Sequence, residues 1–167
     1  MVQDIKDLVE ELKKSEKYKD FSSKHSEAYL TSAFYMAPVN EKPKWTLGFF
    51  DKEEHKLTSF VIDNGVKIFP SQQVMQKEKK EVKRLDLNSI KVTLEKAKEI
   101  VEQFQKEKYP YEGPDKMIIV LQVINDITVW NISYLTTGLK LLNIKVNAIS
   151  GDVIEDSIEN LLKTGSA

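Results

Sequence analysis

Hydrophobic positions in the first half of the chain follow a helical period and then a strand period. One apolar stripe predicts an amphipathic helix over residues 2–19, formed by Ile5, Leu8, Val9 and Leu12. Short apolar runs then predict four strands, at residues 27–36, 45–49, 57–62 and 66–69. We expect Pro70 to end the fourth strand, because proline cannot donate to a sheet ladder.

The second half repeats this order of elements. A second apolar stripe predicts a helix that is capped by Thr93 and extends to about residue 106. Strands are expected at residues 117–124, 127–135 and 139–146, and the first of these is apolar enough to be a central strand. Ser150-Gly151 predicts a turn into Val153 and Ile154, and the last apolar residues predict a short closing helix, namely Ile158, Leu161 and Leu162.

A charged segment separates the two halves. Residues 71–88 contain few apolar side chains, and a basic cluster runs from Lys77 to Arg84. We interpret this cluster as a solvated connector, with a weak partner contact as the alternative. The predicted organisation is therefore a first unit at 1–70, a connector at 71–88, a second unit at 89–163 and a tail at 164–167.

The two halves also resemble each other residue by residue. The segment WTLGF at 45–49 matches WNISY at 130–134, and LTSFVID at 57–63 matches LLNIKVN at 141–147. Internal similarity of this length predicts a duplicated structural unit. We expect an α+β fold of two tandem α-β-β-β units, each an antiparallel sheet with one helix packed on a face. The expected structural anchors are Trp45, Trp130, Tyr134, Gly65 and Gly151.

The second half resembles a PepSY domain. The resemblance rests on the helix at 94–104, the segment at 130–134 and the segment VNAISGDVI at 146–154. The family pattern has Asp and Thr where this chain has Asn147 and Ser150. The first half, from Ile5 to Phe69, looks like a more diverged copy. The resemblance implies a domain without catalytic residues that binds or inhibits peptidases, or acts as a regulatory or ligand-binding module, and most members are exported or membrane-attached.

Composition and charge exclude several classes of function. The chain has 167 residues, with 25 basic and 26 acidic side chains, and this balance argues against a nucleic-acid or anionic-membrane partner. It has no cysteine and only two histidines, so we expect no metal and no cofactor. No stretch has the roughly 20 apolar residues of a membrane helix. The charged N-terminal segment lacks the apolar core of a signal peptide, which predicts a cytoplasmic location.

Candidate catalytic groups have simpler structural interpretations. His25 lies among serines, but a Ser–His pair needs a third, orienting group. His55 follows an acidic run that includes Glu53 and Glu54, a spacing more typical of a solvated turn than of a metal site. An acidic cluster of Asp152, Glu155 and Asp156 is interpreted as a turn and the first turn of a helix, with calcium binding as the alternative. We therefore expect no catalytic residues and no enzyme.

Aromatic residues supply the candidate binding surface. Alternation places Phe34 and Tyr35 on opposite faces of one strand, and Phe49 and Phe50 on opposite faces of the next. Some aromatic side chains must therefore lie away from the helix, where they pack against the other unit or a second copy, or bind a peptide. The predicted binding residues are Tyr29, Phe34, Tyr35 and Phe50. We expect a non-enzymatic protein- or peptide-binding module; the alternatives are a small-molecule-binding protein or weak enzyme with a pocket between sheet and helix, and a structural homodimer.

Overall fold

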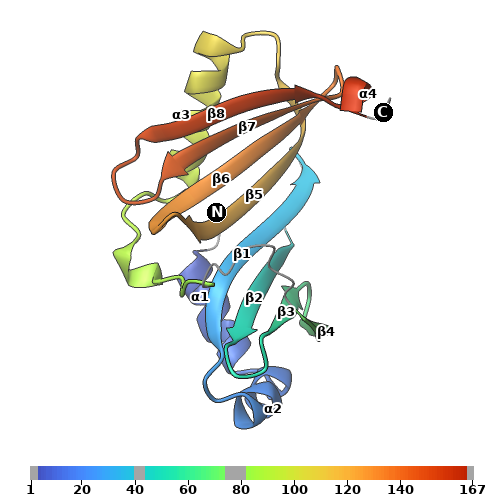
Figure 1. Ribbon diagram of the computed structural model, residues 1–167, viewed down its shortest axis with the longest axis vertical. Helices are drawn as coiled ribbons and strands as arrows, with labels where there is room; N and C mark the ends of the chain where they lie inside the picture. Colours follow the sequence, from blue (N-terminus) through green and yellow to red (C-terminus); the bar gives the residue numbers. More distant parts are fainter. Residues whose placement is uncertain (1–3, 40–43, 74–81, 165–167) are drawn as a thin grey trace.

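Eight antiparallel strands form one continuous sheet in the order β4-β3-β2-β1-β5-β6-β7-β8 (Figure 1). The computed structural model describes residues 4–39, 44–73 and 82–164. The predicted α+β class with antiparallel pairing and two related halves is confirmed, because β1–β4 and β5–β8 form the two halves of the sheet. The prediction of a separate sheet in each unit is wrong, since β1 pairs directly with β5 and joins the halves.

The first half contains two helices where the sequence predicted one. Ser15 interrupts the helical segment: its side chain accepts a hydrogen bond from the Tyr18 backbone N–H and caps a second helix. Strand β4 also continues through Pro70, contrary to prediction, because it is an edge strand whose register shifts opposite Leu57 and Ser59. The elements are α1 (Ile5–Lys13), α2 (Glu16–Lys24), β1 (Tyr29–Pro38), β2 (Trp45–Asp51), β3 (Lys56–Ile62) and β4 (Val66–Gln73).

The second half has one long helix followed by four strands. Glu155, Asp156 and Ile158 lie in an edge strand and not in the predicted closing helix, which begins only at Leu161. The second half thus has four strands instead of the three predicted for it, whereas the first half has the four that its apolar runs predict, one more than the α-β-β-β pattern. The elements are η1 (Leu87–Ser89), α3 (Leu94–Lys108), β5 (Pro114–Ile124), β6 (Ile127–Thr136), β7 (Lys140–Asn147), β8 (Val153–Asn160) and α4 (Leu161–Thr164). The tail was predicted at 164–167, but Thr164 still belongs to α4. Residues 165–167 and much of the connector, residues 74–81, lie outside the described residues.

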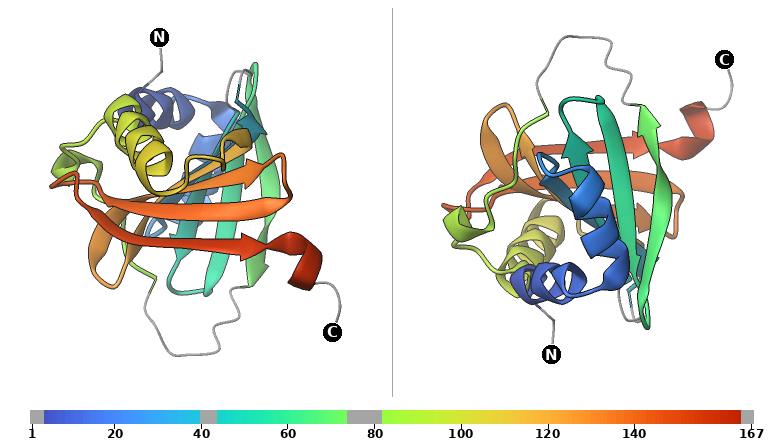
Figure 2. Two further views of the ribbon diagram at one scale, coloured as in Figure 1. Left: turned by 90° about the horizontal axis from the view of Figure 1, so that it is seen from above. Right: turned by 90° about the horizontal axis from the view of Figure 1, so that it is seen from below.

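Helices α1, α2 and α3 cover the same face of the sheet (Figure 2). The sheet twists strongly, and the helices lie inside its bend, where one hydrophobic core joins both halves. Within the described ranges, no helix is both long and apolar enough to cross a membrane. We call the opposite side of the sheet, which these helices do not cover, the free face.

The repeat seen in the sequence is reproduced in the strand register. Leu47 of β2 pairs with Phe60 of β3, and the matched residues Ile132 and Ile144 pair in the same way between β6 and β7. All four side chains are buried in the common core. Trp45 and Trp130 also lie in this core. Matched positions in the two halves therefore contribute side chains to the same hydrophobic core.

Candidate functional site

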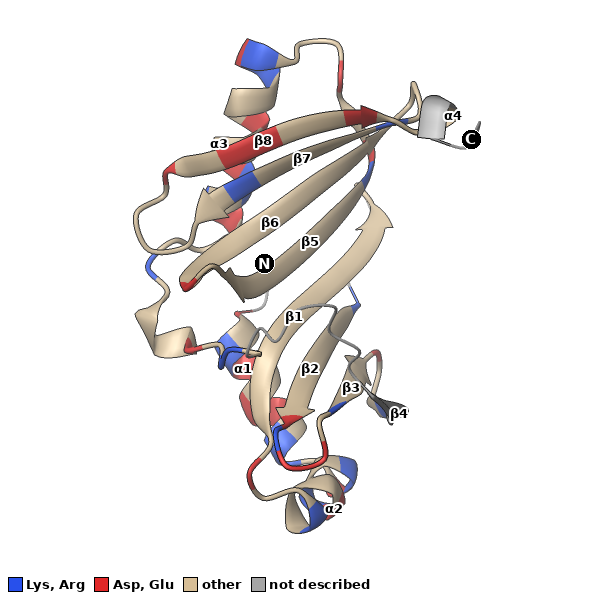
Figure 3. Ribbon diagram, in the orientation of Figure 1, with Lys and Arg blue, Asp and Glu red and all other residues tan. Residues whose placement is uncertain are grey.

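The free face is uncharged across its centre. Strands β1 and β6 contain no charged residue, and the charged residues of β2 and β5 lie only at strand ends (Figure 3). A sheet face that is turned toward water normally alternates polar and charged side chains with the buried ones. Because this region departs from that pattern over four adjacent strands, it is the candidate binding surface.

Four apolar side chains lie at the centre of this surface, where β1 pairs with β5, and we call them the central patch. Phe34 and Met36 of β1 are 37% and 59% exposed. They pair across the β1–β5 ladder with Val120 and Ile118, whose side chains are half-buried. The neighbours on this face are small or neutral, since Phe34 also pairs with Thr46 of β2. The central patch therefore lies where the two halves of the sheet meet.

The structure places the four predicted binding residues in different environments. Phe34 is on the free face, as alternation predicts, but Tyr35 points into the core and is only 4% exposed. Burial raises the pKa of Tyr35 to about 12, so its hydroxyl stays neutral at physiological pH. Phe50 is 2% exposed and packs against Tyr29 and His55. Of the four, Phe34 presents the largest accessible aromatic surface.

Tyr29 is engaged with the end of the connector. Its hydroxyl donates a hydrogen bond to the backbone carbonyl of Val82, and the Arg84 guanidinium lies 5.1 Å from its ring centre. The Leu85 backbone N–H also donates to the carbonyl of Leu30. Tyr29 thus anchors the connector beside β1 and does not join Phe34 in one patch. Met36 was overlooked although alternation places it on the same face of β1 as Phe34. The β5 residues could not be predicted, because the sequence does not show which strand lies next to β1.

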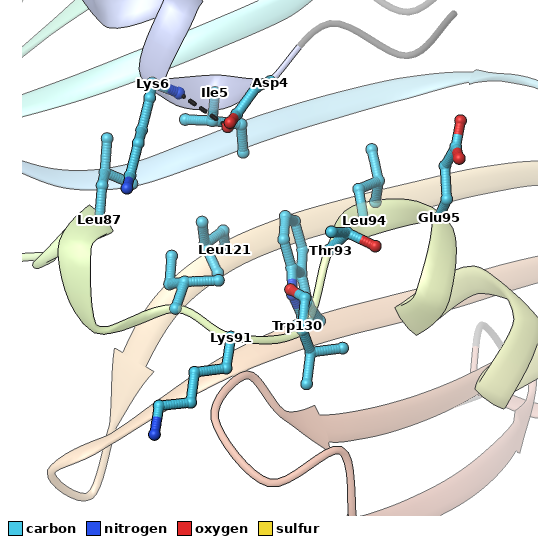
Figure 4. A pocket seen from close by; sticks show the side chains of 12 residues that line it. Asp4, Ile5, Lys6, Leu87, Lys91, Thr93, Leu94, Glu95, Leu121 and Trp130 are labelled. Carbon is cyan, nitrogen blue, oxygen red and sulfur yellow. Dashed lines mark hydrogen bonds between the residues drawn. The ribbon is translucent and has the colours of Figure 1, made fainter.

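A cavity of about 330 Å³ lies on the helix side of the sheet, between the starts of α1 and α3 (Figure 4). Leu121 and Trp130 lie between the two helix starts in this view, and Lys6, Lys91 and Glu95 are among the polar residues that line the cavity. The Trp130 indole N–H is already used, because it donates to the carbonyl of Val92 at 2.9 Å. The cavity is therefore mostly apolar, with charged groups of both signs in its lining.

The predicted structural anchors and acidic groups have clear local roles. Gly65 and Gly151 both have positive φ, at 130° and 82°, as turn glycines require. Asp156 on β8 accepts hydrogen bonds from Lys108 Nζ and the Tyr109 hydroxyl, at 2.8 and 2.6 Å. These contacts tie the end of α3 to β8. The hydrogen bonds from Lys108 and then Tyr109 outweigh burial and hold the pKa of Asp156 below its ordinary value.

Comparison with known proteins supports the fold alone. The sequence matches no family model and no curated protein. The chain is structurally similar to a crystal structure described as a "putative lipoprotein (CD1622)" from Clostridium difficile 630, with a TM-score of 0.55 and 20% sequence identity. The similarity covers 86% of this chain and 90% of the other. Both chains thus have the same overall arrangement of helices and strands.

Proposed function

We propose that the protein is a non-enzymatic, PepSY-like binding module that engages a protein partner through the central patch. The single observation that carries this proposal is the uncharged centre of the free face, where Phe34 and Met36 are exposed. An apolar patch that is continuous over adjacent strands costs solubility, and such patches typically mark interaction sites. The partner that fits is a protein segment with apolar side chains and no charge at its centre, because an ion would lose its hydration there without gaining an opposite charge.

Both edges of the sheet favour docking on the face over addition of a strand. Strand β8 carries Glu155, Asp156 and Glu159 on one edge, and charged edge strands resist pairing with another chain. Strand β4 contains Pro70 on the other edge, which removes a backbone donor. The accessible apolar surface of β1 and β5 is therefore the better docking site.

A displayed peptide library tests this function. We expect the full-length protein to select clones rich in apolar residues and poor in charge. Met36→Lys should weaken binding of these clones at least about tenfold, because it places a charge in the apolar contact. Ile154→Lys is the matched control, since Ile154 is also an exposed aliphatic side chain but lies on the β8 edge.

Two results would count against this function. One is a library that yields no clones above background. The other is equal binding by the Met36→Lys variant and the unaltered protein. Light scattering tests whether the patch binds a second copy of the chain. If the protein is a dimer and Met36→Lys dissociates it, the partner of the patch is a second copy and not another protein.

A small-molecule carrier is the second candidate function, favoured by the cavity between α1 and α3. Its volume lies at the lower end of the range for ligand pockets. Trp130 lines it, so a Trp45→Phe variant leaves one reporter of its occupancy. Titration with anilinonaphthalene sulfonate should change the Trp130 emission, and Ile90→Phe, which enlarges a lining side chain without adding a second tryptophan, should weaken dye binding there. An unchanged Trp130 emission would contradict this candidate.

A further inference from the structure

Three potential metal ligands from distant parts of the chain converge where α2 ends against the turn between β2 and β3. His25 Nδ1 lies 2.7 Å from Asp51 Oδ2 and 4.0 Å from Glu54 Oε2. All three donor atoms lie within 4.8 Å of one another. The sequence pattern places the acidic residues beside His55 and not beside His25, because 26 residues separate His25 from Asp51.

Two of the three ligands, His25 and Asp51, are held in position by their local structure. His25 is the C-terminal cap of α2, where its backbone N–H donates to Phe21 and its ring stacks on the Phe21 ring at 4.9 Å. Asp51 is buried at the end of β2. Its Oδ1 accepts hydrogen bonds from the backbone N–H groups of Glu53 and Glu54, which leaves Oδ2 directed at the imidazole. Fixed orientation of this kind is typical of metal-ligating carboxylates.

The donor geometry is close to that of a bound transition metal. Zinc bonds to histidine nitrogen and carboxylate oxygen are about 2.0–2.2 Å long, so its donor atoms lie about 3–3.5 Å apart. The two separations from His25 Nδ1, 2.7 and 4.0 Å, lie on either side of this range, and the two carboxylate donor atoms lie within 4.8 Å of each other. Only small movements are required, and Glu54 can supply most of them because its side chain is 49% exposed.

The charge balance also favours a cation. Two carboxylates flank one imidazole, which leaves net negative charge whether or not His25 is protonated. Among the described residues, Lys56 is the cation in contact with Glu54, and its Nζ lies 3.8 Å from the carboxylate on the exposed side. A surface pair of this kind is weak, so a divalent ion can displace it.

We propose that His25, Asp51 and Glu54 bind a divalent first-row transition metal ion, with water completing its coordination. The mixed nitrogen and oxygen ligand set suits Zn²⁺ and its neighbours better than Ca²⁺, which takes six to eight oxygen ligands. The bound ion fastens α2 to the turn between β2 and β3. This site is independent of the central patch, which lies on the free face of β1 and β5.

Calorimetric titration of the full chain with Zn²⁺ tests the proposal. We expect one saturable site per chain, with affinity reduced by more than about tenfold in His25→Gln and in Glu54→Gln. Asp51→Asn is a weaker test, because Asp51 also caps the turn and its loss can impair folding. His55→Asn is the matched control, since His55 lies in the same turn with positive φ, which asparagine tolerates.

A spectroscopic measurement separates metal binding from a simple His–Asp hydrogen bond. Zn²⁺ should shift the Nδ1 resonance of His25 in ¹⁵N spectra and leave the ring resonances of His55 unchanged. Full Zn²⁺ affinity in either His25→Gln or Glu54→Gln, with far-UV circular dichroism showing a folded variant, would overturn the proposal. So would the absence of saturable binding by the unaltered protein.

Discussion

Phe34 pairs across the sheet with Val120, its own counterpart in the other half of the molecule. Their equivalence follows from the register: Phe34 pairs with Thr46 and Val120 pairs with Asn131, and these two partners occupy the same position in the matched segments 45–49 and 130–134. A residue pairs with its counterpart only on a two-fold axis. The two units are therefore joined around a pseudo-two-fold axis between β1 and β5, as in the interface of a symmetric dimer.

The continuous ladder predicts that both halves unfold together. Each half contains one tryptophan, so Trp130→Phe leaves Trp45 as the reporter of the first half, and Trp45→Phe leaves Trp130 as the reporter of the second. In each variant, urea unfolding followed by fluorescence should coincide with unfolding followed by far-UV circular dichroism. Separate midpoints for the two probes within one variant would show that each half folds as an independent domain.

The two tryptophans should differ in their contribution to stability. Trp130 donates a buried hydrogen bond to the Val92 carbonyl, whereas no described residue accepts one from the Trp45 indole. We expect Trp130→Phe to lower the free energy of unfolding by about 1–3 kcal/mol, and Trp45→Phe by about 1 kcal/mol less. The comparison requires urea unfolding by circular dichroism at one temperature. Equal losses would mean that the indole hydrogen bond adds nothing beyond packing.

Local patterns predicted the elements of this fold better than their assembly. Asn64-Gly65 and Asn125-Asp126 are typical tight-turn pairs in the sequence, because residues at such turns must accept positive φ, as all four do here. The pairing of β1 with β5 was not visible, since periodicity shows which residues share a face and not which strand lies alongside. Because strand neighbours could not be predicted, two separate sheets were expected.

Element ends were mispredicted where tertiary context outweighs a local signal. Ser15 continues a polar helical pattern in the sequence, but its side chain begins a new helix. Ile158 has helical spacing with Leu161, yet β8 extends past it because Leu142 of β7 pairs with it. The candidate sites depend still more on tertiary structure. Alternation was enough to predict that Phe34 lies away from the helices, while the His25–Asp51 contact depends on how α2 packs against the sheet.

Gly48 should not tolerate a larger side chain because of its contact with Ser32, and a second substitution at Ser32 should remove that obstacle. A Cβ atom at this position would lie 2.7 Å from Ser32 Oγ on the neighbouring strand. Gly48→Ala should therefore lower the free energy of unfolding by about 1–3 kcal/mol through overpacking. Adding Ser32→Ala removes the hydroxyl, and the double variant should regain most of the loss in urea unfolding. Additive losses would show that backbone flexibility, and not the contact with Ser32, is the reason for glycine.

The contact between α3 and β8 should make stability depend on acid pH. The hydrogen bonds from Lys108 and Tyr109 hold the pKa of Asp156 below its ordinary value of about 3.9. A lowered pKa in the folded state stabilises the fold above the unfolded pKa, and this contribution is lost as the pH falls through the folded pKa. Below about pH 4, the melting temperature should therefore fall more steeply for the unaltered protein than for Asp156→Asn.

Asp152→Asn, which removes an exposed acid from the preceding turn, controls for net charge and should retain the steep fall. Parallel pH profiles for Asp156→Asn and the unaltered protein would show that this carboxylate does not set the acid limit of the fold.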